Sequence, residues 1–200
     1  MTMHDSDALQ ALKAELFAHG ERNDAVQQAR GARMLNITPD TGEFLAVLVR
    51  ATQARRVLEI GTSNGYSTLW LAEAAAAIGG RVTTLEFAPD KWRLAQLTFA
   101  RSGLAGTIDA LQADAGVWLA SAGEASVDLM FLDADRDRYL AWWPDLRRVL
   151  RPGGTLVVDN AVSHAAELAA FEAGLRADAA FTCALLPVGK GELVAVRAAG

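Results

Sequence analysis

The chain has 200 residues, of which 52% are hydrophobic and 22% charged, with a formal net charge of −5 and one cysteine, Cys183. This length and composition predict a single domain with a large core. The negative net charge argues against nucleic acid or an anionic membrane as a partner. A single cysteine excludes an intrachain disulfide and a zinc site built from cysteines.

The composition of the N-terminus predicts the compartment. The first seven residues are acidic and contain no basic cluster, so they do not resemble a signal peptide. No apolar run approaches the ~20 residues that a membrane-spanning helix needs. We therefore expect a cytosolic protein.

Residues 1–35 precede the first predicted strand and are expected to form a helical appendage to a single domain of residues 1–200. The pattern predicts two helices, the first ending at Gly20 and the second covering about residues 23–33. The first helix carries an apolar stripe made of Leu9, Leu12, Leu16 and Phe17. The appendage is a lid, a dimer contact or a cover for one sheet edge, and the sequence leaves these alternatives open.

The central feature is a predicted strand, glycine turn and helix in direct succession. Residues 57–60 are apolar and partly β-branched, residues 61–65 form a turn cluster, and residues 66–78 have the apolar spacing of a helix. Such a turn exposes backbone N–H groups at a helix N-terminus, and its glycines let a ligand approach closely. The alternative is that Gly61 and Gly65 only form a tight turn.

The rest of the chain alternates strands with helices. After a loop and helix that begin near residue 34, further strands are predicted at 82–85, 108–111, 127–132 and 155–158, with helices at 89–101, 116–120, 139–150 and 165–175. Residues 151–154 are expected to terminate the helix before them. The last two strands, 181–186 and 193–196, are too close for a crossover, so the final strand must be antiparallel. The predicted fold is α/β and Rossmann-like: a doubly wound seven-stranded sheet, mostly parallel, with helices on both faces.

Acidic residues follow the ends of four of the predicted parallel strands, where ligands bind in open α/β sheets. Few basic residues are near them in the sequence, so a phosphate-rich ligand is disfavoured. Glu86 follows Gly61 at about the sequence separation at which an acid at the end of the second strand binds a ribose. The alternatives for Glu86 are a helix cap or a solvated position. Asp114 suits an adenine amino group or a helix cap. Glu59 is expected to satisfy loop N–H groups or to contact a ligand.

Three oxygen-bearing side chains, Asp133, Asp159 and Asn160, follow the fourth and fifth predicted strands. Hard oxygen ligands of this kind favour Mg²⁺, or less often Ca²⁺ or Mn²⁺. Acids at strand ends are also common helix caps, which is the alternative.

Taken together, these motifs resemble the class I S-adenosylmethionine-dependent O-methyltransferases of the catechol and caffeoyl-CoA type. The resemblance covers about residues 30–197 and is carried by residues 36–42, 57–67, Glu86, 131–139, 150–154 and 158–160. It implies methyl transfer from S-adenosylmethionine to a hydroxyl of a small catechol-like or phenolic acceptor, assisted by a divalent metal. It also implies a homodimer.

The resemblance assigns roles to individual residues. It implies cofactor contacts by Asn36, Ile37, Glu59, Gly61, Ser63, Gly65, Tyr66, Ser67, Glu86, Phe87, Ala113, Asp114, Ala115 and Asp133. It implies metal binding by Asp133, Asp159 and Asn160, and a place for Asp133 in catalysis.

The chain departs from the family pattern at one catalytic position. Three residues after Asp133 the family usually has a lysine as general base, whereas this chain has Arg136. Arginine stays protonated and cannot accept a proton, but it can stabilise an oxyanion. His164 is the alternative base, unless it is only a residue at a helix N-terminus. Tyr139, Trp142 and Trp143 are candidates to line an aromatic pocket, and the helical spacing of Tyr139 and Trp143 also suits core or dimer contacts.

Two competing functions remain open from the sequence. Arg136 is compatible with a protein that binds S-adenosylmethionine without catalysis or without a metal. A nucleotide-binding fold is also compatible with an NAD-dependent oxidoreductase, but the acids at the strand ends and the spacing of residues 61–65, which is not G-x-G-x-x-G, count against it.

Overall fold

The computed structural model describes residues 3–199, in which seven strands form one sheet in the order β3-β2-β1-β4-β5-β7-β6. The strands are β1 (Arg56–Ile60), β2 (Arg81–Glu86), β3 (Ile108–Gln112), β4 (Val127–Leu132), β5 (Leu150–Val158), β6 (Phe181–Leu186) and β7 (Glu192–Arg197). Strands β1 to β5 are parallel, and β7 is antiparallel to both neighbours, β5 and β6. The predicted fold class is confirmed.

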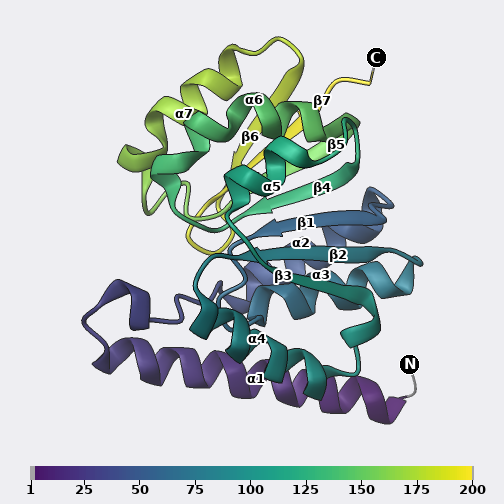
Figure 1. Cartoon of the computed structure of the whole chain (residues 1–200), viewed down its shortest axis with the longest axis vertical. Coiled ribbons are helices and arrows are strands. Elements are labelled where there is room, and N and C mark those ends of the chain that lie inside the picture. The colour runs from purple at the N-terminus through teal and green to yellow at the C-terminus, as the bar shows by residue number, and fades with distance from the viewer. Residues whose placement is uncertain (1–2, 200) are drawn as a thin grey trace.

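Helices cover both faces of the sheet. Successive side chains of a strand point to opposite faces, and apolar strand residues on each face pack against helices. The helices α2 (Pro39–Ala51), α3 (Tyr66–Ala77) and α4 (Pro89–Ser102) share one core with Val57 and Phe131. The helices α5 (Ala115–Ser121), α6 (Tyr139–Val149) and α7 (Ala165–Ala177) share the other core with Leu58 and Met130. Figure 1 shows the two groups on either side of the sheet.

The strand order reverses between β1 and β4, the first and fourth strands in the sequence. Chain segments leaving these two strands turn to opposite faces, which opens a crevice at their carboxyl ends. Strand β4 is buried along its whole length, as expected of a central parallel strand. The crevice therefore lies in the middle of the molecule rather than at a sheet edge.

The N-terminal region contains one long helix, α1 (Met3–Val26), and a short 3-10 helix, η1 (Arg30–Ala32). The prediction of two helices separated at Gly20 is wrong. A Cβ at residue 20 would overlap the side-chain amide of Asn36. Gly20 thus permits a close approach of another segment within the helix instead of ending it.

Helix α1 forms an outer layer that packs on α3 and α4 (Figure 1). The predicted apolar residues Leu9, Leu12 and Leu16 are buried there. Lys13 is only 2% exposed; its ammonium is 2.5 Å from Glu73 and 3.6 Å above the centre of the Trp70 ring. The appendage therefore covers helices rather than strands. Within residues 3–199 no helix has the length and apolarity needed to cross a membrane.

Strand β5 begins earlier than predicted, because residues 151–154 belong to the strand instead of a turn. The guanidinium of Arg151 lies 2.8 Å from the Asp128 carboxylate on β4, and the β4–β5 register shifts between Val127 and Leu129. Arg56 of β1 binds the same carboxylate at 2.7 Å. These ion pairs hold the amino-terminal edge of the sheet, opposite the crevice.

Candidate active site at the carboxyl ends of the strands

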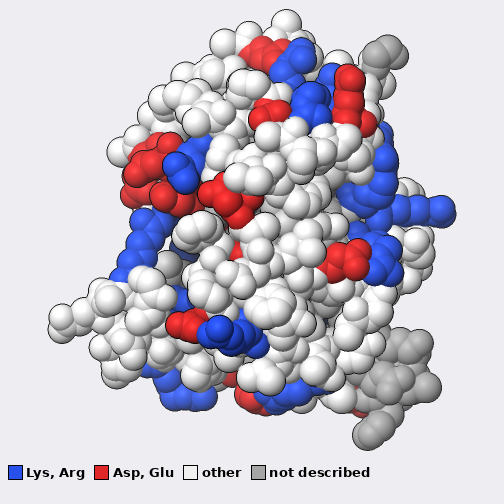
Figure 2. All heavy atoms as spheres, viewed as in Figure 1, with Lys and Arg blue, Asp and Glu red and all other residues white. Residues whose placement is uncertain are grey.

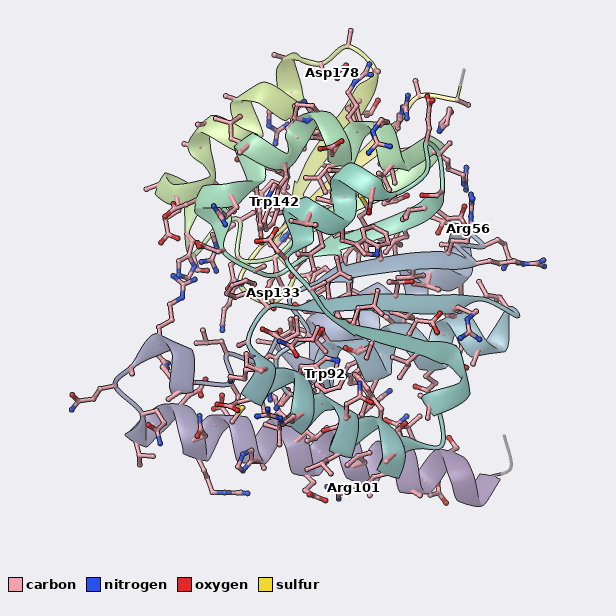
Figure 3. The ribbon with its side chains drawn as sticks, in the orientation of Figure 1. Arg56, Trp92, Arg101, Asp133, Trp142 and Asp178 are labelled. Carbon is pink, nitrogen blue, oxygen red and sulfur yellow. The ribbon has the colours of Figure 1, made fainter. Side chains whose placement is uncertain are left out.

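A cavity of about 890 Å³ opens at the carboxyl ends of β1, β2, β4 and β5. In Figure 3, Asp133 lies at the centre of the molecule, with Trp142 of α6 on one side of it. Eleven of the residues predicted for the site line this cavity: Gly61, Ser63, Glu86, Phe87, Ala113, Asp114, Ala115, Asp133, Arg136, Asn160 and His164. The positions of the strand ends thus predicted residues that line one cavity.

The glycine turn after β1 depends on its backbone conformation. Gly61 has φ +107°, and a Cβ there would overlap the carbonyl of Asp133. Only glycine therefore allows the ends of β1 and β4 to meet. Ser63 also has a positive φ, 48°, and its hydroxyl donates to the carbonyl of Met34 at 2.8 Å. The turn is fixed against the segment that follows η1.

Glu86 is oriented by two backbone groups. Its carboxylate accepts the N–H of Ser63 and the N–H of Ala88, each at 2.8 Å. The second contact is the cap-like role near the start of α4 that the sequence left open. Since each carboxylate oxygen has a further lone pair, the side chain can still accept hydrogen bonds from a ligand in the cavity.

Glu59 does not have the role expected of it. The side chain is fully buried and accepts the hydroxyls of Ser67 at 2.5 Å, Thr84 at 2.6 Å and Thr68, rather than loop N–H groups. It does not line the cavity. Burial raises the pKa of Glu59 to about 7, against the lowering effect of these hydroxyls. Glu59 therefore ties β1, β2 and α3 together beneath the glycine turn.

Five further residues that were predicted to contact the cofactor do not line the cavity: Asn36, Ile37, Gly65, Tyr66 and Ser67. Asn36 donates its amide to the carbonyl of Leu16 at 3.0 Å, and Ile37 is buried in the core. Tyr66 packs on Trp70. Gly65, with φ 86°, precedes α3 and faces Phe99. Ile37, Tyr66 and Ser67 are buried and Asn36 is hydrogen-bonded to α1, so these side chains lie away from the cavity surface.

The far side of the cavity is formed by the segment after β3. Asp114 is the N-cap of α5, with its carboxylate accepting the N–H of Val117 at 3.0 Å. The cap role is thus present, and the same residue lines the cavity. Phe87 is 74% exposed, as a ring without a protein partner would be. Trp142 lines the cavity, whereas Trp143 packs on Phe171 in the core.

The three predicted metal ligands converge. The amide nitrogen of Asn160 lies 2.5 Å from the Asp159 carboxylate and 3.4 Å from the Asp133 carboxylate. Asn160 has φ 65°, a left-handed conformation that points to a position fixed by its surroundings. Burial, and then the charge of Asp159, raise the pKa of Asp133 well above its usual value. Two carboxylates and an amide therefore share one small, partly desolvated space.

A residue that the sequence analysis missed lies behind this group. Glu192, at the start of β7, is fully buried and accepts the hydroxyl of Thr41 at 3.1 Å, while its other carboxylate oxygen has no hydrogen-bond donor. Burial and the charge of Asp159 raise the pKa of Glu192 to about 10. No group of three His, Cys, Asp or Glu side chains in the described chain is arranged for a metal ion. A cation here would therefore require the amide oxygen of Asn160.

Arg136 and His164 lie on the open side of this group. Arg136 is 8% exposed, and its guanidinium is 3.3 Å from Glu167. The Nδ1 atom of His164 is 2.9 Å from the Ser163 hydroxyl. Burial, followed by the charge of Arg136, lowers the pKa of His164. The imidazole is therefore neutral at pH 7 and can accept a proton.

The expectation of few basic residues at the site is wrong. Six basic side chains line the cavity, against the four acids Glu86, Asp114, Asp133 and Asp135; the basic ones are Arg30, Arg33, Lys91, Arg136, Arg138 and Lys190. They come from η1 and its flank, α4, the 3-10 helix η3 (Arg136–Arg138) and the β6–β7 turn. The sequence predicted Arg136 for the site, but only the folded chain brings the other five there, so no local sequence signal predicted them.

The doubly wound sheet with a final antiparallel strand, the glycine turn before α3 and the acid ending β2 together define a Rossmann-like methyltransferase fold. The sequence pattern of the O-methyltransferase family matches residues 11–197. The chain belongs to the O-methyltransferase family.

Known relatives agree with this assignment. The chain is 38% identical to a catechol O-methyltransferase of Mycobacterium tuberculosis over 152 residues, 76% of this chain and 65% of the relative. It is 34% identical to a catechol O-methyltransferase of Niastella koreensis over 135 residues, 66% of this chain and 61% of the relative. These matches span less than two thirds of either curated relative.

Solved structures extend the comparison to nearly the whole chain. An O-methyltransferase from Bacillus cereus in complex with SAH superposes with a TM-score of 0.77 and 26% identity, covering 96% of this chain and 90% of that one. The fold and the family are thus supported by sequence and by structure.

Proposed function

We propose that this protein transfers the methyl group of S-adenosylmethionine to a hydroxyl of a small catechol-like or phenolic acceptor, with a divalent cation, Mg²⁺, at the site. One observation carries the proposal. Asp133 and the Asp159–Asn160 pair converge beside the cavity that also contains Gly61, Ser63 and Glu86. A cofactor and a cation site therefore share one wall, which the reaction requires.

The cofactor half of the cavity consists of Gly61, Ser63, Glu86, Asp114 and Phe87. Glu86 is positioned to accept the ribose hydroxyls, and Phe87 and Asp114 flank the place for the adenine. The SAH bound to the Bacillus cereus relative supports this use of the fold. The cofactor supplies a methyl group on a sulfonium, and the chain holds it by backbone and hydroxyl groups around the turn.

The acceptor half consists of Asp133, Arg136, Asn160 and His164, with Asp159 behind them. Asp133, Asp159 and Asn160 fit a hard divalent ion, because a half-turn of the Asn160 amide presents its oxygen between the two carboxylates. Such an ion would orient adjacent hydroxyls of the acceptor and favour the ionised form. The names of the two catechol O-methyltransferase relatives support this acceptor class.

Proton removal falls to His164 in this proposal. Arg136 remains a cation and stabilises the negative charge on the acceptor oxygen instead. The neutral imidazole of His164, on the same wall of the cavity, is the available base. A homodimer and a cytosolic location stay predictions; light scattering checks the first.

Two measurements test the proposed function. Thermal shift with S-adenosylhomocysteine and separately with NAD(H) identifies the cofactor, and we expect stabilisation by S-adenosylhomocysteine only. Methyl transfer to catechol is then measured with Mg²⁺ and with a chelator, and we expect turnover that the chelator removes.

Each other outcome points to a different protein. Stabilisation by NAD(H) alone would identify an oxidoreductase. Binding of S-adenosylhomocysteine without turnover on any phenol would identify a non-catalytic binding protein, and turnover unaffected by the chelator would remove the metal from the mechanism.

A further inference from the structure

The charge of the cavity is opposite to the charge of the whole chain. The chain has a formal net charge of −5, yet six basic and four acidic side chains line the cavity. Basic side chains are visible in Figure 2 along the left edge, across the opening between the N-terminal segment and the upper half of the molecule. The overall composition does not account for this excess of basic side chains, so the neighbours of each one must be considered.

Three of the six cations have an acidic neighbour, and a fourth, Lys91, donates to a backbone carbonyl. Arg136 pairs with Glu167 at 3.3 Å and Arg138 with Asp114 at 3.8 Å. Arg33 lies 4.0 Å from Asp24, and the ammonium of Lys91 donates to the carbonyl of Arg33. These four contacts explain the basic residues as parts of the protein's own framework.

Two cations have no such partner. Among the side chains that the structure describes, those of residues 6–199, no carboxylate lies within 4.0 Å of the side chain of Arg30 or Lys190. Both are exposed and both line the cavity. Lys190 lies beside the acceptor half, because its carbonyl accepts the N–H of Ser163, the residue before His164. Arg30 lines the same cavity as Arg136 and His164.

The backbone that carries each cation is held in place. Beside Arg30, the carbonyl of Ala32 accepts the amide of Asn23 at 3.0 Å. The carbonyl of Lys190 itself accepts the N–H of Ser163 at 3.0 Å, and the adjacent Gly189 N–H donates to the Asp40 carboxylate at 2.9 Å. The two charges thus project from fixed segments into the same opening.

We propose that the acceptor carries a carboxylate on the side of its ring remote from the reacting hydroxyls, and that Arg30 and Lys190 bind it. This inference rests on the proposed function and names the substrate class within it. With the hydroxyls at Asp133 and Asn160, the remote side of a small ring faces the opening of the cavity, where these two unpaired cations lie. Their attraction favours an anionic acceptor over a neutral one of the same shape.

A matched pair of acceptors tests the inference. We would compare 3,4-dihydroxybenzoate with 3,4-dihydroxybenzamide, which has the same size and shape but no charge. Dissociation constants are measured by calorimetry on protein saturated with S-adenosylhomocysteine in Mg²⁺, and kcat/KM is measured with S-adenosylmethionine. We expect the benzoate to be preferred about tenfold in both quantities at low salt, and less at high salt.

The variants assign the preference to the two residues. In Arg30→Gln with Lys190→Gln the preference is expected to fall to about one, through weaker binding of the benzoate only. The affinity for S-adenosylhomocysteine is expected to stay unchanged. Arg22→Gln, an exposed arginine on α1 away from the cavity, is the matched control and is expected to keep the preference.

The outcomes separate this inference from the proposed function. Equal affinity for the two acceptors, or a preference that survives the double variant, would overturn the inference even if both acceptors are methylated. Weaker binding of S-adenosylhomocysteine in the double variant would also overturn it, because the cations would then serve the cofactor. A binding preference for the benzoate without turnover would support the inference and count against the proposed function.

Discussion

The cofactor half and the acceptor half of the cavity lie side by side on one sheet, but their polar groups are satisfied in different ways. In the cofactor half, both oxygens of Glu86 accept backbone N–H groups, and Glu59 beneath the turn accepts three hydroxyls. In the acceptor half, Asp133 and Asp159 share one amide, and an oxygen of Glu192 has no donor.

This difference shows which half needs a ligand to complete it. Satisfied hydrogen bonds hold the glycine turn in one conformation before anything binds, so a cofactor bound there would meet a preformed surface. Like charges in a partly buried group are unfavourable until a cation joins them. We therefore expect substitutions in the acceptor half to reduce catalysis, and substitutions in the cofactor half to reduce stability and cofactor affinity.

The largest effect is expected from Asp133→Asn. Loss of this carboxylate removes a charged group at the reacting centre, and kcat/KM is expected to fall roughly 10³-fold. Because the substitution also removes repulsion with Asp159, the thermal midpoint is expected not to fall. Asp137→Asn, an exposed acid on η3, is the control. A variant with normal turnover would show that the proposed cation site is not used.

The second effect is a pH-dependent change in stability through Glu59→Gln. The pKa of Glu59 is about 7 in the folded protein, because burial raises it from the ordinary glutamate value of 4.5. Folding therefore takes up a proton between these values, and the free energy of unfolding falls as pH rises from 4.5 to 7, by at most about 3 kcal/mol. Glutamine lacks this change, so any stability advantage of the wild type over the variant shrinks across that window.

Urea unfolding at pH 5, 6 and 8 measures this change, with Glu124→Gln as an exposed control. A constant difference between wild type and Glu59→Gln at all three pH values would show that Glu59 titrates normally.

The third effect concerns cofactor affinity. Glu86→Gln leaves one of the N–H groups of Ser63 and Ala88 without an acceptor, and the affinity for S-adenosylhomocysteine is expected to fall about thirtyfold. At saturating S-adenosylmethionine, kcat should change less than about threefold, because the acceptor half is intact. Calorimetry and initial rates test both expectations, with Asp90→Asn on the exposed start of α4 as the control. Loss of kcat with normal affinity would contradict the division into halves.

The smallest effect is expected from His164→Ala. Its lowered pKa keeps the imidazole neutral at pH 7, and protonation at lower pH should reduce the wild-type rate. The variant is expected to lose about tenfold in kcat/KM near pH 7, and less at higher pH where hydroxide replaces the base. His19→Ala, an exposed histidine on α1, is the control. Identical pH–rate profiles for wild type and variant would assign proton removal elsewhere.

The sequence predicted the parts of the site that depend on strand ends. Asp133 and Asp159 directly follow apolar runs, and neighbouring parallel strands bring such positions to one edge. The structure confirms that they converge with Asn160. The same logic located Gly61 and Glu86 beside them.

Contacts between distant segments decided what the sequence did not predict. The sequence predicts a helix end at Gly20, but the helix continues through it. The glycine is needed because the Asn36 side chain lies where a Cβ would be. The sequence predicts a turn at Arg151, but its ion pair with Asp128 of β4 holds this residue in β5. Arg30 and Lys190 belong to a 3-10 helix and a hairpin turn, where no periodicity indicates which way a side chain points.

Asp24, near the end of α1, connects the outermost helix to the cavity. Its carboxylate accepts the N–H of Met34 at 2.6 Å and that of Leu35 at 2.8 Å, and both residues line the cavity. A ligand that orders this segment thereby also restrains the end of α1, although no described residue of α1 lines the cavity. Amide hydrogens in the last turns of α1 should consequently exchange with deuterium more slowly when the cavity is filled, which makes the helix a reporter of occupancy.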